Sequence, residues 1–364
     1  MAIIDTKGWA VGLVTTMVVL LAGMWNSKDS SIQFLQRRLE AVSSILAMSS
    51  EELEKLPSDS TRAPTTPSLH HNEMAKATDV NTWIPGLELL ECVGQGSFGK
   101  VHFCQWHGEN AAVKIMSWKG SRMSKVDPLR EAELCKSLVH PNLVQTYTFF
   151  FRNQGESSLE KHEIWIIQEW CDLGTLSQFC RRSTSEGVPD QECKKILQDV
   201  CKATAYLHAS GVIHGDLTSN NVLLKAAKPK KEVTKNDVCS PEEYVCKVCD
   251  FGLARVLEEG ITELLTSQLG TVSHMPPELI QLEDKRLSKK ADIYAVGMLL
   301  YEVTVGEIPY RGMMVPQIIL SVAKGKKLCL PECVNEPFRE IYDRCTHRDP
   351  SERPSADQLV ALFK

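Results

Sequence analysis

The run V-I-H-G-D-L-T-S-N-N at Val212–Asn221 decides the interpretation of this chain, together with D-F-G at Asp250–Gly252. Both runs follow the glycine-rich segment G-Q-G-S-F-G at Gly94–Gly99. Three glycines at this spacing let the backbone bend sharply and bring its N–H groups close to phosphate oxygens. A dinucleotide-binding fingerprint has similar glycines, but there a helix follows them. Here the strand-like Val101–Trp106 follows, so the sequence predicts a β-hairpin whose turn covers a phosphate.

A lysine lies inside the next expected strand, Asn110–Met116. In that position Lys114 needs a charged partner, unless the strand is an edge strand and the lysine lies in solvent. A helix is expected next, and Glu131 shares its apolar face with Cys135 and Leu138. A carboxylate on such a face needs a cation. We therefore expect an ion pair between Lys114 and Glu131.

In this order the motifs resemble those of the eukaryotic protein kinase superfamily, in particular its tyrosine-kinase-like serine/threonine branch. The resemblance covers residues 87–364. It implies an α+β, two-lobed protein kinase fold, with a small antiparallel β lobe and one main helix at 83–170 and a larger, mostly helical lobe at 171–364. The implied function is the transfer of the ATP γ-phosphate to serine and threonine residues of protein substrates, with Mg²⁺ as cofactor.

The resemblance also implies a role for each residue of the site. Asp216 is the catalytic base, and Lys114 holds the α- and β-phosphates while Glu131 fixes it. Asp250 and Asn221 bind Mg²⁺, a cation that prefers hard oxygen ligands. The other nucleotide-binding residues lie in the glycine-rich hairpin, the third strand and the hinge: Val93, Gly94, Gln95, Gly96, Ser97, Phe98, Gly99, Val101, Ala112, Glu169 and Cys171.

Three more residues resemble structural residues of the family. Glu278 is expected to pair with Arg353. Asp292 begins a helix that is apolar on nearly every side, which is typical of a buried helix. Its carboxylate is expected to bind the backbone of the catalytic loop.

Two positions depart from the family pattern. Gly215 replaces an arginine that normally meets a phosphate on the activation loop, so we expect activity not to depend on loop phosphorylation by that route. Thr218 replaces the lysine that is usual in serine/threonine kinases. The alternatives are therefore a tyrosine or dual-specificity kinase and a pseudokinase scaffold. The run G-T-V-S-H at Gly270–His274 favours serine/threonine transfer.

Two polar insertions look peculiar to this chain. Arg152–His162 is expected to form a loop between strands. Ala226–Tyr244 carries four lysines and is either a solvated loop or a docking site.

Composition excludes several classes of protein. Hydrophobic residues make up 43% of the chain and charged residues 24%, as in ordinary globular proteins. The net charge of −5 disfavours a nucleic-acid-binding protein. The 13 cysteines are scattered and no glycosylation sequon occurs, which favours a reducing compartment.

Residues 1–28 contain a hydrophobic segment. Its uncharged run, Gly8–Trp25, would span about 27 Å as a helix and has a tryptophan near each end. We expect a single-pass membrane anchor, with a cleaved signal peptide and a buried helix as alternatives. Three positive charges, Lys28, Arg37 and Arg38, follow this run and only Lys7 precedes it, which predicts a cytosolic kinase domain. The alternative location is the cytoplasm without an anchor.

Residues 29–56 are expected to form an amphipathic helix. Apolar residues at heptad spacing from Ile32 to Leu56 predict either weak self-association or a single helix lying on another surface. Residues 57–82 contain Pro57, Pro64 and Pro67 among serines and threonines and are expected to form a flexible linker.

Overall fold

The computed structural model describes residues 83–96, 99–119, 128–154, 161–182, 188–227, 244–258, 260–266, 270–280 and 285–363. All of them fall within one compact unit that begins at residue 76. The anchor predicted at 1–28, the helix at 29–56, the linker at 57–82, Ser97 and Phe98 lie outside the described residues. Within the ranges that are described, no helix has the length and apolar character needed to cross a membrane.

The small lobe is an antiparallel five-stranded sheet with strand order β1-β2-β3-β5-β4. Its strands are β1 (Leu87–Gly96), β2 (Gly99–Trp106), β3 (Glu109–Lys119), β4 (Thr146–Gln154) and β5 (Lys161–Glu169). Gly96 pairs with Gly99 at the end of the first hairpin, so the predicted β-hairpin is confirmed. Alternate apolar residues of β3 and β5, such as Val113 and Ile167, form the core of this lobe.

The insertion predicted at Arg152–His162 is wrong at both ends. β4 and β5 extend into it, and Arg152 pairs with Glu163 while Asn153 pairs with His162. The strands continue because backbone pairing does not require apolar side chains.

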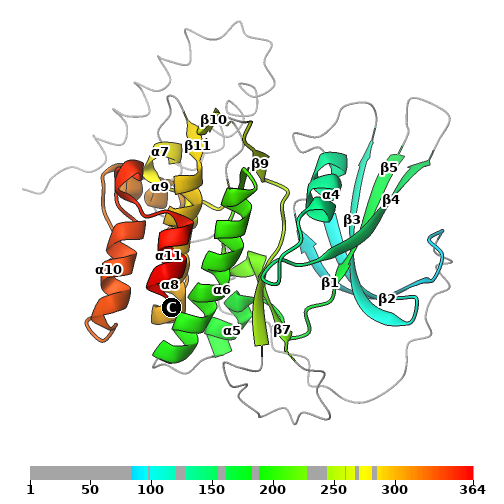
Figure 1. Ribbon diagram of the computed structural model, residues 1–364, viewed down its shortest axis with the longest axis horizontal. Coiled ribbons are helices and arrows are strands. Elements are labelled where there is room, and N and C mark those ends of the chain that lie inside the picture. The colour runs from blue at the N-terminus through cyan, green and yellow to red at the C-terminus, as the bar shows by residue number, and fades with distance from the viewer. Residues whose placement is uncertain are drawn as a thin grey trace, which may run out of the picture. The chain divides into compact units, whose positions relative to one another are not determined.

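A helix, α4 (Pro128–Ser137), lies beside the sheet (Figure 1). Proline at the first position suits a helix start, since the N–H that it lacks would have no partner within the helix. Glu131 and Cys135 are buried, as the periodicity predicted, and Glu133 on another side of the helix is exposed. The segment after α4 then joins the large lobe, because the Val144 N–H donates to the Val248 carbonyl and the Val248 N–H to the Asn142 carbonyl.

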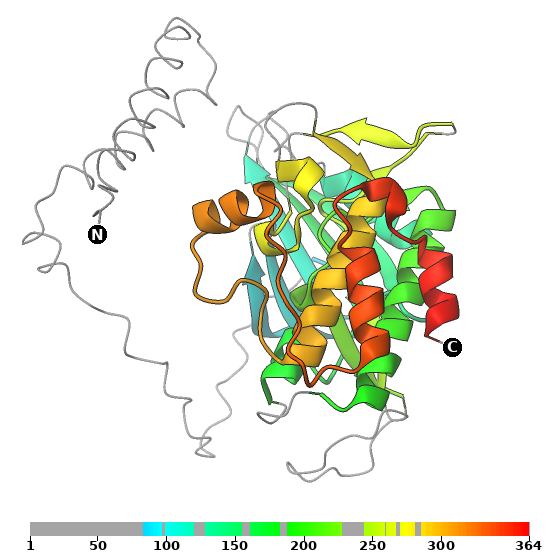
Figure 2. The same cartoon turned by 90° about the vertical axis from the view of Figure 1, so that its left-hand side faces the viewer.

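The large lobe is mostly helical (Figures 1 and 2). Its helices are α5 (Leu176–Arg182), α6 (Asp190–Ala209), α7 (Pro277–Ile280), α8 (Lys289–Val305), α9 (Val315–Ala323), α10 (Glu336–Cys345) and α11 (Ala356–Leu362). As the sequence predicted, α8 is buried on nearly every side. The Ser288 hydroxyl caps its start, and Gly306 ends it with a left-handed backbone conformation.

Short paired strands position the two motif runs that decide the fold. The pairs are β6 (Val212–Ile213) with β9 (Arg255–Val256), β7 (Val222–Ala226) with β8 (Tyr244–Val248), and β10 (Glu263–Leu265) with β11 (Arg286–Ser288). Three 3-10 turns complete the lobe: η1 (Ser219–Asn221), η2 (Val272–His274) and η3 (Pro350–Glu352). Asp216 lies between β6 and η1, and Asp250 lies just after β8. The paired ribbons therefore bring together two segments that are distant in sequence.

A buried ion pair holds the end of the large lobe to α7. The Arg353 guanidinium, fully buried, donates to both carboxylate oxygens of Glu278 at 2.7 and 2.8 Å. It also donates to the carbonyls of His347 and Lys290 at 2.8 and 2.9 Å. The predicted pairing of Glu278 with Arg353 is confirmed.

Replacing Arg353 by methionine is expected to lower the free energy of unfolding by about 3 kcal/mol, because a largely buried carboxylate loses its counter-charge and two hydrogen bonds. The matched control is Arg311→Met, which removes an exposed ion pair with Glu307 and is expected to cost less than about 0.5 kcal/mol. Urea unfolding followed by tryptophan fluorescence measures both changes. Equal losses in the two variants would contradict this account.

Candidate active site

Lys114 is buried between two carboxylates. Its Nζ lies 2.7 Å from Glu131 Oε1 on α4 and 2.8 Å from Asp250 Oδ1 after β8. Because β3 pairs with β2 on one side and β5 on the other, the alternative of an edge-strand lysine in solvent is wrong. The predicted pairing with Glu131 is confirmed, and Asp250 adds a second bond that connects the two lobes.

Lys114 and Asp250 stabilise each other's charge against burial, whereas burial raises the pKa of Glu131 although Lys114 opposes it. Burial would lower the pKa of Lys114, but the carboxylates of Asp250 and Glu131 outweigh that effect and raise it. Burial would likewise raise the pKa of Asp250, but the Lys114 ammonium outweighs burial and lowers it. Lys114 and Asp250 are therefore both charged at neutral pH.

The backbone at Asp250 holds its carboxylate in place. Asp250 has a φ of 65°, in the left-handed region that few non-glycine residues adopt. The adjacent Phe251 is buried and its ring packs on His214, with the ring centroids 5.3 Å apart. The Gly252 N–H donates to Asp250 Oδ1 at 3.3 Å. Such strain is often found at functional sites, where the surrounding contacts maintain it.

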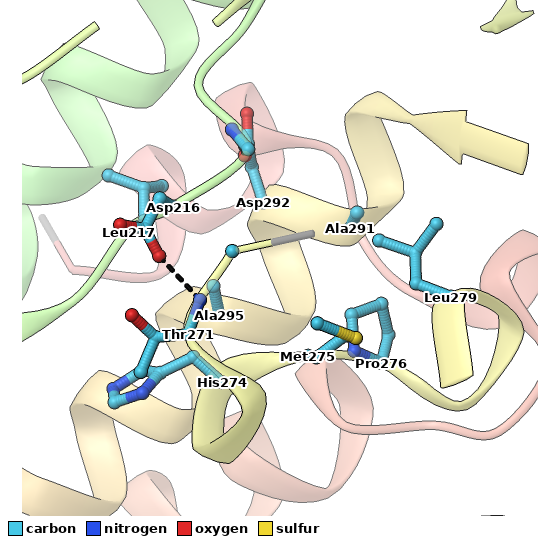
Figure 3. A pocket seen from close by; sticks show the side chains of 12 residues that line it. Asp216, Leu217, Thr271, His274, Met275, Pro276, Leu279, Ala291, Asp292 and Ala295 are labelled. Carbon is cyan, nitrogen blue, oxygen red and sulfur yellow. Dashed lines mark hydrogen bonds between the residues drawn. The ribbon is translucent and has the colours of Figure 1, made fainter. Parts of the chain in front are cut away.

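Asp216 receives a hydrogen bond on each carboxylate oxygen. The Thr271 N–H donates to Oδ1 at 2.7 Å, as the dashed line in Figure 3 shows. The Asn221 amide Nδ2 donates to Oδ2 at 3.1 Å and to the Asp216 carbonyl at 2.8 Å. The three residues thus form one hydrogen-bonded group, and the direction of the Asp216 carboxylate is fixed by its neighbours.

The loop that carries Asp216 is held by Asp292 from α8. The backbone N–H groups of His214 and Gly215 donate to the two Asp292 oxygens, each at 2.9 Å. Burial would raise the pKa of Asp292, but hydrogen bonds from His208 and from the Gly215 backbone lower it. The predicted contact of Asp292 with the catalytic-loop backbone is confirmed.

His214 serves as a structural link in the same loop. Its Nδ1 accepts from the Asp216 N–H at 3.2 Å, and its Nε2 lies 3.0 Å from the Cys249 carbonyl. These partners require the proton to be on Nε2. Because Cys249 precedes Asp250, His214 connects the two aspartate-bearing segments.

The two departures from the family pattern have structural consequences. Gly215 has a φ of 78°, and a Cβ there would lie 3.0 Å from the Leu253 carbonyl oxygen, so an arginine side chain would be strained. Thr218 is buried and only 4% exposed. Its short side chain cannot reach out of the loop as a lysine would.

Oxygen atoms suited to a hard cation remain available next to these groups. Within the described residues, the Asp250 carboxylate accepts two hydrogen bonds, from Lys114 Nζ and from the Gly252 N–H. Both are accepted by Oδ1, which leaves Oδ2 for a metal. Asn221 donates through Nδ2, so its Oδ1 faces elsewhere. One carboxylate and one amide oxygen fit Mg²⁺, which usually takes few protein ligands and completes its shell with phosphates and water.

The expected nucleotide-binding residues are grouped in β1, β2, β3, the end of β5 and the segment after it. The described members are Val93, Gly94, Gln95, Gly96, Gly99, Val101, Ala112, Glu169 and Cys171. Among the described residues, nothing lies within 4 Å of a Cβ built at Gly94 or Gly96, so these residues leave room for another molecule close to the backbone of the hairpin. A Cβ at Gly99 would lie 2.3 Å from the Ile115 carbonyl oxygen, so glycine is needed there for strand packing.

The sequence did not reveal the role of the Glu169 side chain. Its carboxylate pairs with Lys225 at 2.7 Å and with Lys247 at 2.9 Å. Burial would raise the pKa of Glu169, but hydrogen bonds from these lysines lower it. No local pattern signals a contact between a hinge residue and the β7–β8 ribbon.

A small pocket lies next to Asp216 (Figure 3). Its lining includes Leu217, Thr271, His274, Met275, Pro276 and Leu279. Burial lowers the pKa of His274 to about 4, so this imidazole is neutral at physiological pH. The pocket is therefore mostly apolar, and the two acidic residues in its lining are Asp216 and Asp292.

Comparisons with known proteins agree with this geometry. The family model described as protein tyrosine and serine/threonine kinase matches residues 87–363. Tyrosine-protein kinase SRK3 of Spongilla lacustris is 29% identical over 279 residues, which cover 76% of this chain and 75% of that protein. Serine/threonine-protein kinase CTR1 of Arabidopsis thaliana is 30% identical over 76% of this chain, but the match spans only 31% of that protein. Tyrosine protein-kinase src-1 of Caenorhabditis elegans is 31% identical over 83% of this chain and 52% of that protein.

The close approach at Gly270 provides a test of the group around Asp216. A Cβ there would lie 2.5 Å from the Gly215 carbonyl oxygen and 2.8 Å from Asp216 Oδ1. Gly270→Ala is expected to displace the Thr271 N–H and to lower turnover about 100-fold, while nucleotide affinity stays unchanged. Phosphoryl-transfer kinetics and a fluorescence titration with nucleotide measure the two effects, and thermal unfolding verifies the fold. Unchanged turnover would contradict the assigned geometry.

Proposed function

The chain belongs to the family of protein tyrosine and serine/threonine kinases, and we propose that it transfers the γ-phosphate of ATP to serine and threonine residues of protein substrates. The observation that carries this proposal is the joining of two groups of residues. Lys114 and Asp250 form one group, and Asp216 with Asn221 forms the other. The Cys249 N–H donates to the Asn221 carbonyl at 2.9 Å, which brings the two groups to one site.

Each of these residues has a task in phosphoryl transfer. Lys114 binds the α- and β-phosphates of ATP, with Glu131 holding it in place. Asp250 and Asn221 hold Mg²⁺, which neutralises charge on the phosphates. Asp216 orients the substrate hydroxyl and accepts its proton as the hydroxyl oxygen bonds to the γ-phosphorus and the bond to ADP breaks. Transfer of this kind depends on positioning and charge stabilisation more than on covalent chemistry.

The choice of serine and threonine rests on the segment that faces Asp216. The Thr271 backbone contacts the carboxylate directly, in a run that resembles the substrate-binding segment of serine/threonine kinases. Transfer to tyrosine or to both types of hydroxyl is the alternative, since relatives of both kinds match the chain.

A pseudokinase scaffold is the second alternative, because Thr218 stands in place of a lysine. The presence of Lys114, Glu131, Asp216, Asn221 and Asp250 supports an active enzyme instead. Removing a donor to the transferred phosphate lowers turnover, so we propose a slow enzyme and not an inactive one.

For the whole chain we propose the order of segments that was predicted from the sequence. Residues 8–25 anchor it in a membrane in a single pass, and residues 32–56 add weak self-association. A linker at 57–82 leads to a cytosolic kinase domain at 83–364. The support is the uncharged run, the heptad spacing and the positive charges that follow the hydrophobic segment.

Phosphoamino-acid analysis after autophosphorylation with labelled ATP and Mg²⁺ tests the assigned reaction. Label is expected on serine and threonine, and Asp216→Asn is expected to lower incorporation by about 100- to 10,000-fold, because the general base is lost. Label on tyrosine alone would establish the tyrosine alternative. If neither the unmodified chain nor the Asp216→Asn variant incorporates label and both are folded, the pseudokinase alternative would be established.

Removal of residues 1–26 tests the anchor. The full chain is expected in the membrane pellet after an alkaline wash, because an uncharged helix of this length resists extraction. The shortened chain is expected in the supernatant, with kinase activity retained. Unchanged membrane association of the shortened chain would refute the anchor.

A further inference from the structure

Helix α9 exposes apolar residues that its own lobe does not cover. Only Ile318 and Val322 of this helix are buried. Five large apolar residues on it and just before it are exposed, with Met314 at 67%, Leu320 at 54% and Val315 at 53%. We define the α9 face as Met313, Met314, Val315, Ile319 and Leu320.

These residues form one continuous surface. At about 100° per residue, Val315, Ile319 and Leu320 lie within an arc of about 140°. Leu320 lies opposite the buried Ile318 and Val322, and Val315 lies next to Val322 at the edge of the buried side. Residues 312–323 contain no charged side chain, although most of them are exposed. Contiguous exposed apolar surface of this kind commonly marks an interaction site.

Positive charge borders the C-terminal end of the α9 face. Lys324 and Lys326 are exposed just after the helix. The Arg348 guanidinium lies against Gly325, because a Cβ there would be 2.8 Å from Arg348 Nη1. Among the residues placed in the structure, no carboxylate forms an ion pair with any of these three cations. The chain as a whole has a net charge of −5, so this basic cluster is a local feature.

The α9 face lies beside the candidate active site. Helix α9 packs against α7 and η2, and these elements contribute Leu279 and His274 to the pocket next to Asp216. In Figure 2, α9 (orange) lies at the margin of the large lobe. A protein whose phosphorylated residue reached Asp216 would thus have another part of its surface near α9.

We propose that the α9 face docks an acidic amphipathic helix of the protein substrate, an inference that rests on the proposed kinase function. The apolar side of that helix covers Met313, Met314, Val315, Ile319 and Leu320. Its acidic residues meet Lys324, Lys326 and Arg348, which supplies the charge complementarity that selects a partner. The two adjacent methionines suit such a surface, because their flexible side chains adapt to different partners.

A lipid surface fits the α9 face less well. Helices that bind the membrane interface commonly carry tryptophan, phenylalanine and leucine on their apolar side. Of these types the α9 face has only Leu320 and no aromatic residue. The five exposed residues of the α9 face are aliphatic or methionine. The observations therefore favour a protein helix.

The test joins a docking helix to an acceptor. The acceptor is a serine-containing peptide. It is selected from a peptide library as one that the full chain phosphorylates. The docking helix is a synthetic peptide of about 18 residues with leucine at heptad positions and glutamate on the other faces, joined through flexible glycine-serine linkers of about 8, 16 and 24 residues. The matched control carries lysine in place of each glutamate.

The acidic fusion is expected to have a KM at least about tenfold below that of the acceptor alone, because docking raises the local concentration of the acceptor. The double variant Ile319→Ser/Leu320→Ser is expected to remove this advantage without changing the kinetics of the acceptor alone. Val139→Ser, which alters an apolar residue 62% exposed in another part of the chain, is expected to keep the advantage.

Direct binding separates failure of this proposal from failure of the kinase function. The fluorescein-labelled acidic helix is titrated with the full chain, so binding is measured without phosphoryl transfer. Three results would overturn the docking proposal even if the acceptor is phosphorylated. They are equal binding of the acidic and basic helices, no binding of either helix, and full binding of the acidic helix by the double variant. Loss of the acceptor reaction with docking intact would overturn only the kinase function. The surface would be assigned to a membrane instead if the full chain bound phosphatidylserine vesicles, the double variant did not, and the acidic helix did not bind.

Discussion

The site depends on a single buried ammonium group with two carboxylates. Lys114 is only 9% exposed in the middle of a sheet, and a charged group in that position is stable only with close counter-charges. Glu131 supplies one from α4 and Asp250 supplies the other from the large lobe. The position of the helix beside the sheet and that of the loop after β8 are therefore coupled through one atom, Lys114 Nζ.

The second half of the site is built from backbone groups. Asp292 accepts from the N–H groups of His214 and Gly215, and Asp216 accepts from the N–H of Thr271. Backbone donors have little freedom to reorient, so the direction of the Asp216 carboxylate is set before any substrate binds. The apolar α8 supports this arrangement because its burial fixes Asp292 beneath the loop.

Much of this could be predicted from the sequence, since the residues concerned lie in motifs or follow a clear period. The position of Glu131 followed from helical spacing, and the hairpin at Gly94–Gly99 followed from the strand-like residues on both sides. The strand ends within Arg152–His162 were missed because polar residues on an exposed hairpin give no hydrophobic contrast. The requirement for glycine at position 270 was also hidden, because it arises from the close approach of two loops in three dimensions.

The pairing of Glu169 with Lys225 and Lys247 bears on how the lobes can open. Lys247 also donates to the Pro141 carbonyl at 2.8 Å, so the connection after α4 and the hinge are fastened to the same ribbon of the large lobe. A swing of the sheet away from the helical lobe would then turn about these two fastened points. The end of α4 near Ser137 would act as a pivot, and Glu131, nearly two turns away, would travel along an arc. Small angular changes at the pivot would thus be amplified where the ammonium group is held.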